Sequence, residues 1–590
     1  MSIFNALSLL GGLALFLYGM EDMGNGLTQT AGGKLEKILA RLTSSPFKGM
    51  LLGLCVTGII QSSSATTVMV VGLVNSGMMQ LSQAIGVIMG ANIGTTVTSW
   101  ILSLTGISSS NIWVQMLKPS SFTPVLAAIG ICMIMFSKSE KKHSIAHIML
   151  GFAILMTGMD MMSSAVTPLA SDPNFTRLFV MFKNPLLGVA VGAGVTAIIQ
   201  SSSASVGILQ ALAATGTVSF GAAIPIILGQ NIGTCVTAMI SAAGANRNAK
   251  RAAFVHLYFN LIGTTLFLIV FYSVNAFAHF AFLGDPANAV GIAIFHSSFN
   301  IVTTAILLPC AKLLEKLATL TLRDRGQAVE TAAAGDQELK LLDPRFLSRP
   351  GFAAQQCHTV GCRMAELVEE EFSAAVTLLT DFDHTRKEDV IKLENRVDSY
   401  EDQLGEYLVK LSGRELNAED SRTVSILLHS IGDLERMADR AVNIAETAES
   451  MQKKELQFSE EAKSELLIYT GALTETLELS VQALESEDGV LASRIEPMKG
   501  VCASINNELK ERHIERLQKG ICTIQLGVML EDLLMNFGSV SDHCSNIGLC
   551  IRQIEEQGMA THEELERMQE GGDDNYNLVF RKFQAKYELP

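Results

Sequence analysis

Charged side chains are scarce in the first 320 residues of this 590-residue chain, because most of its 59 Asp and Glu residues lie after that point. Apolar runs fill this weakly charged half, and several reach the roughly 20 residues that a helix needs to cross a bilayer. They cover roughly 3–20, 49–78, 81–104, 121–137, 144–163, 184–217, 219–243, 252–283 and 289–311. We therefore expect a polytopic membrane domain followed by a soluble domain.

Several other features are missing, and each absence excludes a class of protein. The ten cysteines include no C-x-x-C pair, which favours reduced thiols in a cytoplasmic setting. No basic patch indicates nucleic acid as a partner, and no G-x-x-x-x-G-K-[ST] loop supports ATP-driven transport. The N-terminus lacks the basic region of a signal peptide, so 3–20 is read as a first membrane helix. No nucleophile and base pair is evident, so we do not expect an enzyme.

The membrane half contains a duplicated unit. The segments "GIIQSSSAT" (58–66) and "AIIQSSSAS" (197–205) lie 139 positions apart, and so do "GANIGTTVT" (90–98) and "GQNIGTCVT" (229–237). Aligned without gaps from 46 to 98, 24 of 53 positions are identical. "LFLYGMEDM" (15–23) also aligns with "ILMTGMDMM" (154–162) at this spacing. Isolated Ser and Thr in membrane helices are mostly packing residues, but two matching copies favour a functional role.

Basic residues predict that the two copies are inverted. Lysines and arginines favour cytoplasmic loops, and they cluster at 34–48, 138–142 and 247–251. The helix at 3–20 then runs inward, whereas its partner at 144–163 runs outward. For the crossings to balance, each QSSS segment must be a re-entrant hairpin with its polar tip near the midplane, which is typical of secondary transporters.

The chemistry of the tips favours an oxyanion. Serines before a helix can cap it and leave N–H groups and hydroxyls to donate to an anion. We expect the glycine of "NIGT" to break its helix, so that freed carbonyls could bind a cation. No Lys or Arg falls inside the apolar runs around these motifs. A multiply charged anion would therefore need mobile cations, which favours coupling to sodium.

With "HLYFN" (256–260) and "HSSFN" (296–300), these motifs resemble the bacterial sodium/phosphate cotransporters related to the animal type II sodium-dependent phosphate transporters. The resemblance implies sodium-driven phosphate symport across roughly residues 3–311. It implies a phosphate site of Gln61, Ser62, Ser63, Ser64, Gln200, Ser201, Ser202 and Ser203. Asn92, Thr95, Asn231 and Thr234 would complete this site or bind sodium, and we add Thr66 and Ser205, just beyond the serines, as further candidates.

The second half reads as an all-helical bundle after a linker at 317–352 of mixed charge, Ala, Gly and Pro. "DLERMADRAVNIAE" (433–446) and "NFGSVSDHCSNIGL" (536–549) form a weak repeat that resembles the PhoU domain. In that family an E-x-x-x-D-x-x-x-[DN] helix face can hold a divalent or iron metal, which implies Glu435, Asp439 and Asn443, with Asp542 and Asn546 in the second copy. Gly538 replaces the glutamate there, and a salt-bridged surface remains the alternative.

The sequence thus predicts an all-α protein of two parts. Residues 1–316 form the membrane domain of two inverted repeats, about 3–137 and 144–311, and residues 353–590 form a cytoplasmic PhoU-like domain. We expect a sodium-coupled phosphate symporter in a bacterial inner membrane, with phosphate, sodium and the bilayer as partners. The alternatives are a phosphate-binding sensor or scaffold that does not translocate, and a symporter of another oxyanion. Stoichiometry, direction of flux and oligomeric state, including a homodimer, stay open.

Overall fold

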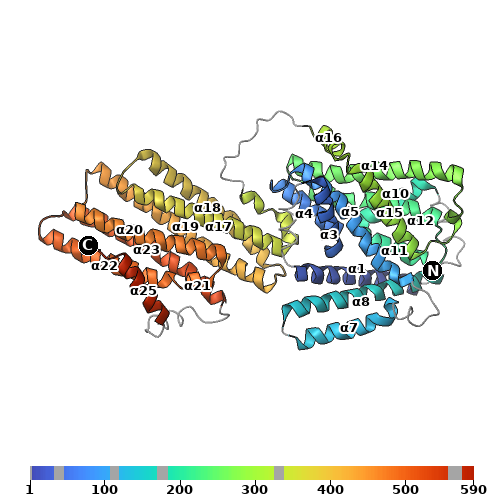
Figure 1. Cartoon of the computed structure of the whole chain (residues 1–590), viewed down its shortest axis with the longest axis horizontal. Coiled ribbons are helices and arrows are strands. Elements are labelled where there is room, and N and C mark those ends of the chain that lie inside the picture. The colour runs from blue at the N-terminus through green and yellow to red at the C-terminus, as the bar shows by residue number, and fades with distance from the viewer. Residues whose placement is uncertain are drawn as a thin grey trace. The chain divides into compact units, whose positions relative to one another are not determined.

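The computed structural model describes residues 3–31, 45–106, 118–137, 139–168, 184–323, 338–555 and 574–590. Within these ranges every regular element is a helix, and one isolated bridge joins Ser219 and Pro286 (Figure 1). The chain divides into two compact units, residues Met1–Glu330 and Thr331–Pro590. The predicted all-α class is confirmed.

The N-terminal unit contains seven spans, among the described residues, that are long and apolar enough to cross a membrane. Six are the helices α1 (Ile3–Ala31), α5 (Leu81–Ser103), α7 (Pro119–Phe136), α8 (Glu140–Val166), α14 (Arg247–Ala278) and α15 (Ala289–Leu307). The seventh combines α12 (Phe220–Gly233) and α13 (Cys235–Ser241). These spans are the apolar runs that carry no QSSS motif, so the predicted polytopic membrane domain is confirmed.

The two runs that carry QSSS are each split into two short helices. The first forms α3 (Pro46–Ile60) and α4 (Ser63–Asn75), and the second forms α10 (Pro185–Ile199) and α11 (Ser202–Ala213). Proline at the first helical position begins α3 and α10, where its missing N–H costs nothing. Apart from the last residue of α11, these boundaries repeat at the 139-residue spacing, so the duplication seen in the sequence is a duplication of structure.

Helices α1 and α8 pack closely and run antiparallel. A Cβ at Gly12 would lie 2.9 Å from the backbone N of Met162, and one at Gly26 would lie 2.7 Å from the backbone O of Ser144. As the residue number along α1 increases, the number of the residue it contacts on α8 decreases, so the two helices are antiparallel. Glycines allow this close approach, as is common between membrane helices. Because α1 and α8 are equivalent in the duplication, this part of the two copies has opposite directions.

The remaining helices of the N-terminal unit surround the two hairpins. Helix α14 packs against α4 and α5 of the first copy and α12 and α13 of the second, while α15 packs against α5 and α12. Helix α7 packs beside α8 (Figure 1). The short elements are η1 (Leu104–Gly106), η3 (Ala281–Gly284) and α16 (Ala311–Thr321). Helices α14 and α15 therefore each contact both copies of the duplicated unit.

The C-terminal unit is a helical bundle, as predicted. Helices α17 (Pro350–Thr377), α18 (His384–Ser412) and α19 (Ala418–Lys453) pack together, as do α20 (Glu460–Ser486), α22 (Ile495–Gln518) and α23 (Ile524–Glu555). Helix α19 packs on α23 and joins the two sets. The unit also contains α21 (Gly489–Ala492) and α25 (Asp574–Lys586). Fully buried Tyr400, Phe372, Tyr469 and Phe537 contribute to its core.

The last part of the predicted linker belongs to this bundle. Residues 338–350 include the 3₁₀ turns η4 (Leu339–Leu341) and η5 (Pro344–Ser348). Phe346 is fully buried and packs edge-on against Phe352, and the Tyr407 hydroxyl donates to the Asp343 carbonyl at 2.9 Å. These anchors explain why a segment of linker-like composition folds here. The predicted linker residues 324–337 lie outside the described residues.

Candidate functional site

Each QSSS motif forms the turn between two helices, and its glutamine ends the first helix. Gln61 has φ 60° and ψ 21°, and Gln200 has φ 59° and ψ 21°. This left-handed conformation costs a residue with a side chain roughly 1–2 kcal/mol. It still allows the Gln61 N–H to donate to the Thr57 carbonyl at 2.8 Å, which closes α3. Both copies place a glutamine in this strained conformation at the same position, and backbone strain that is kept in this way is typical of a functional site.

The serine after each glutamine caps the second helix. The Ser62 hydroxyl oxygen accepts from the Ala65 N–H at 3.2 Å, and Ser201 does the same for Ala204 at 3.2 Å. The N–H groups of the first turn of a helix lack intrahelical acceptors and carry its positive dipole end. Helices α4 and α11 therefore present donors at both QSSS turns, the arrangement that binds oxyanions.

Each QSSS turn contacts the NIGT segment of the other copy, and these two contacts are reciprocal. The Ser203 hydroxyl lies 3.4 Å from the Thr98 hydroxyl, and the equivalent Ser64 hydroxyl lies 3.4 Å from Thr237. Ser64 also lies 3.5 Å from the Gln200 carbonyl oxygen. Reciprocal contacts between equivalent residues are the signature of a two-fold relation. The structure thus brings together the two motifs that lie far apart in the sequence.

The two glutamines are not in equivalent surroundings. Gln61 is 6% exposed, and its side-chain oxygen accepts from the Thr98 hydroxyl at 2.8 Å. Gln200 is exposed. Of the six predicted serines, Ser63, Ser202 and Ser203 are buried. The other three, Ser62, Ser64 and Ser201, are half-buried.

A second difference concerns the hydroxyls below each turn. In the first copy, Thr57 donates to Thr66 at 3.0 Å, and both are fully buried. The equivalent Thr196 and Ser205 hydroxyls are also buried, yet neither has a hydrogen-bond partner among the described residues. A buried polar group without a partner is costly, so these oxygens mark a place where a ligand or water would fit.

The expectation that glycine breaks the NIGT helices is wrong for the first copy. Helix α5 is continuous through Gly94, where a Cβ would lie 2.7 Å from the Thr57 Cβ and 2.8 Å from the Leu54 carbonyl. In the second copy only Thr234 separates α12 from α13. The glycine serves the close packing of α3 on α5 instead. Freed backbone carbonyls are therefore not the cation ligands that we expected at Gly94.

The asparagines and threonines of NIGT are buried and bonded to their own helices. The Asn92 and Asn231 side-chain N–H groups each donate to the carbonyl four residues earlier at 2.9 Å. The Thr95 and Thr234 hydroxyls each do the same at 3.0 Å. Each threonine hydroxyl proton is thus used within its helix, whereas each asparagine amide still offers its oxygen and a second N–H.

Sequence reasoning missed two residues at the centre of the contacts. Thr98 and Thr237 touch the opposite QSSS turn, although only the earlier threonines of the same segments were chosen. Both end the nine-residue repeats "GANIGTTVT" and "GQNIGTCVT", so their repetition was the available signal. Nearby, the His296 ring bonds the Ser99 hydroxyl at 2.6 Å, which ties α15 to α5.

In the C-terminal unit, carboxyl groups of three helices face one another. Glu371 of α17 is fully buried, and neither of its oxygens has a partner among the described residues. Burial and the nearby carboxylates of Glu394, Asp439 and Asp398 raise the pKa of Glu371 to about 9. Burial and Asp439 likewise raise the pKa of Glu435. Of the predicted metal ligands, Glu435 and Asp439 therefore lie in a crowded acidic cluster, to which sequence reasoning had not added the residues of α17 and α18.

In the second copy of that motif, the side chains already bind other residues of the same unit. Asp542 pairs with Lys499 at 3.1 Å, and Asn546 donates to Asp433 at 3.1 Å. His543 also contacts Asp433, at 2.7 Å. Across the described residues, no three Asp, Glu, His or Cys side chains are grouped closely enough to hold a metal ion. The second copy therefore matches the alternative to a metal site, a salt-bridged surface.

Comparison with known proteins adds two family matches. The family model described as Na+/Pi-cotransporter matches residues 15–164 and again 154–284. The PhoU domain model matches residues 362–448. The double match to one model reflects the duplicated unit.

Several known proteins are similar to this chain. The putative inorganic phosphate export protein YjbB of Escherichia coli K12 is 24% identical over 515 residues, which is 87% of this chain and 91% of that protein. The uncharacterized protein YqeW of Bacillus subtilis is 31% identical over 317 residues, 52% of this chain and 95% of that protein. The sodium-dependent phosphate transport protein 2A of Rattus norvegicus is 39% identical over 99 residues, 16% and 15% of the two chains.

Proposed function

Since this chain belongs to the Na+/Pi-cotransporter family and also carries a PhoU domain, we propose that it moves inorganic phosphate across a membrane together with sodium. In this proposal the phosphate binds between the two QSSS turns. The C-terminal unit regulates the transport.

The observation that carries the proposal is the meeting of the two turns. At the N-terminus of α4 the Ser64 hydroxyl lies 3.5 Å from the Gln200 carbonyl oxygen. At the N-terminus of α11 the Ser203 hydroxyl lies 3.4 Å from Thr98, which also bonds Gln61. A phosphate would receive hydrogen bonds from N–H groups, hydroxyls and amides without meeting a fixed positive charge. The predicted phosphate site therefore stands as our proposal, with Thr98 and Thr237 added to it.

Sodium would supply the missing positive charge. The best-supported place for one ion is beside the unpartnered hydroxyls of Thr196 and Ser205, directly below the second turn. Hard cations prefer oxygen ligands of this kind. Thr66 already bonds Thr57 in the equivalent place, so we assign this role to the second copy. The side-chain amides of Asn92 and Asn231 remain candidates for either ligand, through the oxygen for sodium and through the second N–H for phosphate.

An inverted repeat accounts for the geometry. Antiparallel α1 and α8 and the reciprocal contacts of the two turns support two copies related by an axis in the membrane plane. Each hairpin would then enter from an opposite side, and rocking of one copy against the other would expose the anion alternately. Gln61 is buried and Gln200 is exposed, which would correspond to a binding site that is open to one side of the membrane only.

We place the protein in a bacterial cytoplasmic membrane with its C-terminal unit in the cytoplasm, since basic residues such as Arg247, Lys250 and Lys142 favour that side. The other basic residues that predict a cytoplasmic side, Lys34 to Arg41 and Lys138, lie outside the described residues. In the C-terminal unit we propose a divalent or iron metal at Glu435, Asp439 and Asn443, a role that does not extend to Asp542 and Asn546. Binding would require these side chains to move closer together, since no group of three Asp, Glu, His or Cys side chains is close enough among the described residues.

Two alternative functions remain, and each is supported by an observation. A phosphate sensor that does not translocate would use the same turns, and the PhoU domain favours regulation. A symporter of another oxyanion would also use them, since helix N-termini recognise charge more than identity. A homodimer is compatible with each.

Flux into liposomes tests the proposal. Purified protein is reconstituted, and labelled phosphate is followed under inward, outward and absent sodium gradients, with sulfate and arsenate as competitors. Uptake that follows the sodium gradient is expected, and reversal of the gradient should reverse the flux. Phosphate binding without gradient-driven flux would refute transport and leave the sensor. The Gln452→Ala variant is the control for changes in the turns, because Gln452 is exposed near the end of α19 in the C-terminal unit.

A further inference from the structure

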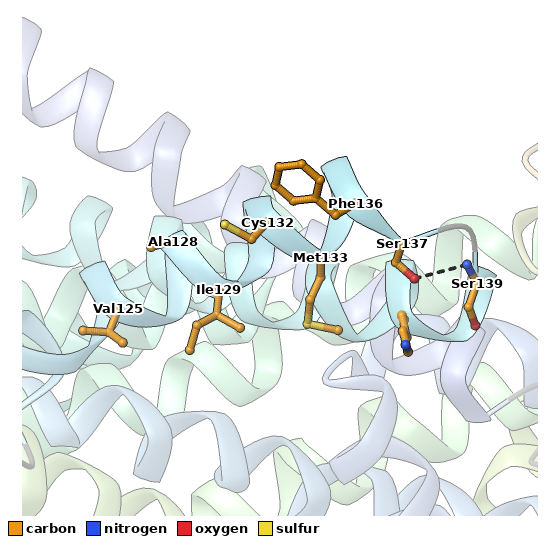
Figure 2. Close-up of a pocket in the computed structure, with 9 residues that line it drawn as sticks. Val125, Ala128, Ile129, Cys132, Met133, Phe136, Ser137 and Ser139 are labelled. Carbon is orange, nitrogen blue, oxygen red and sulfur yellow. Dashed lines mark hydrogen bonds between the residues drawn. The ribbon is translucent and has the colours of Figure 1, made fainter.

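An open apolar groove runs along α7, away from the QSSS turns. Its volume is about 740 Å³. The apolar lining is Val125, Ala128, Ile129, Cys132, Met133 and Phe136, and Ser137, Ser139 and Lys142 line its far end. Figure 2 shows the apolar side chains along one stretch of α7, with the two serines where that helix ends. The groove thus changes from apolar to polar along its length.

The length of the groove matches one leaflet of a bilayer. From Val125 to Phe136 the helix rises about 16 Å, and half of the hydrocarbon core is about 15 Å. Val125 is 58% exposed and Phe136 is 81% exposed. Within a membrane these side chains face lipid. The apolar part would therefore fit one acyl chain over the depth of one leaflet.

The polar end has the charge that a lipid phosphate needs. Lys142 lies in the first turn of α8, where the helix dipole is already positive. The N-cap Ser139 makes no side-chain capping bond, and no carboxylate among the described residues pairs with Lys142. A lysine at a helix N-terminus is unfavourable unless an anion offsets it. The Ser137 hydroxyl accepts from the Ser139 N–H at 3.2 Å, which holds both serines at the groove end.

We propose that this groove binds an anionic phospholipid, with an acyl chain along α7 and the headgroup phosphate at Lys142, Ser137 and Ser139. Basic pockets at the end of membrane helices select anionic headgroups in this way. The binding is independent of transport, so it stands or fails separately from the proposed function.

Headgroup selectivity measured by native mass spectrometry tests the proposal. The full chain in detergent is mixed with equal amounts of dioleoylphosphatidylglycerol and dioleoylphosphatidylcholine. We expect wild type to retain severalfold more of the anionic lipid, and Lys142→Ala to lose this preference. Lys141→Ala is the matched control, because Lys141 is exposed but does not line the groove. Equal losses in both variants, or no preference in wild type, would overturn the proposal.

Alkylation of Cys132 gives a second readout, which also detects a second copy of the chain in the groove. Cys132 is exposed there, and Cys55 on α3 is an exposed internal reference. Modification of Cys132 by a maleimide should slow severalfold relative to Cys55 when vesicles contain phosphatidylglycerol instead of phosphatidylcholine. Unchanged rates would count against a lipid at this site. Disulfide-linked dimers through Cys132 would identify a second copy as the occupant and would also refute it.

Discussion

Replacing Gln61 with glycine separates the chemistry of the turn from its backbone. Glycine adopts the left-handed conformation freely, so Gln61→Gly removes the strain of roughly 1–2 kcal/mol. Against this stand two lost hydrogen bonds, from Thr98 to the amide oxygen and from the amide N–H to the Gly58 carbonyl, at about 0.5–1.5 kcal/mol each. The extra chain entropy of glycine costs about 0.5–1 kcal/mol more. The losses exceed the relieved strain on average, so the protein should lose about 1 kcal/mol of stability, and at most about 3 kcal/mol.

Phosphate handling should respond very differently. An amide that donates to a charged oxygen contributes about 1.5–3 kcal/mol, which corresponds to a loss of roughly 10- to 100-fold in phosphate affinity. We therefore expect Gln61→Gly and Gln200→Gly to raise the KM for phosphate by this factor while their unfolding temperatures fall by only a few degrees. Gln61→Asn tolerates the same conformation and keeps an amide, so it should recover part of the affinity.

The assay is sodium-driven uptake of labelled phosphate in liposomes, with thermal unfolding of the same preparations. Gln452→Ala, at an exposed position of α19, should match wild type in both measurements. Wild-type phosphate KM in both glycine variants would refute the placement of the anion at the turns. A large fall in unfolding temperature would refute the energy balance, because the turn would then depend on the side chain for its fold.

Three other changes test separate parts of the structure. Gly19→Ala should destabilise the protein by about 1–3 kcal/mol, since its Cβ would meet the backbone of α8, whereas Gly194→Ala, with open space around it, should not lower the unfolding temperature. Ser205→Ala should raise the sodium concentration for half-maximal uptake severalfold at little cost in stability, because its hydroxyl has no partner among the described residues; an unchanged sodium dependence would refute its role. The raised pKa of Glu371 means that the folded state holds a proton that the unfolded state releases above its ordinary pKa of 4.5. Stability should therefore fall as pH rises towards 9, by at most about 1.4 kcal/mol per pH unit, and Glu371→Gln should flatten this slope in denaturant titrations at pH 6 and 8.

Local signals in the sequence predicted the helices well. Apolar runs of sufficient length became seven candidate spans, and the polar interruption in the two remaining runs became the turns at Gln61 and Gln200. These features depend on burial and helix termination, which neighbouring residues determine. The 139-residue repeat then predicted that both turns would have one geometry, and their φ and ψ values agree within 1°.

Features that depend on distant partners were not predictable in the same way. Gly94 is needed because α3 passes close to α5, and nothing next to it in the sequence distinguishes this role from a helix break. Glu371 lies 68 positions before Asp439, so the acidic cluster emerges only when three helices are packed. The predicted linker contained Phe346, whose burial likewise depends on the bundle.

The differences between the two copies carry as much information as their likeness. Identical sequence at the turns gives identical backbone, yet Gln61 is buried and Gln200 is exposed. A symmetric binding protein would have no reason to satisfy Thr66 and leave Ser205 without a partner. A carrier must favour one side at a time, because equal access from both sides would let the bound anion leak. Two equivalent hairpins in unequal surroundings are therefore what alternating access would require, and this asymmetry supports the proposed transport over a sensor that only binds phosphate.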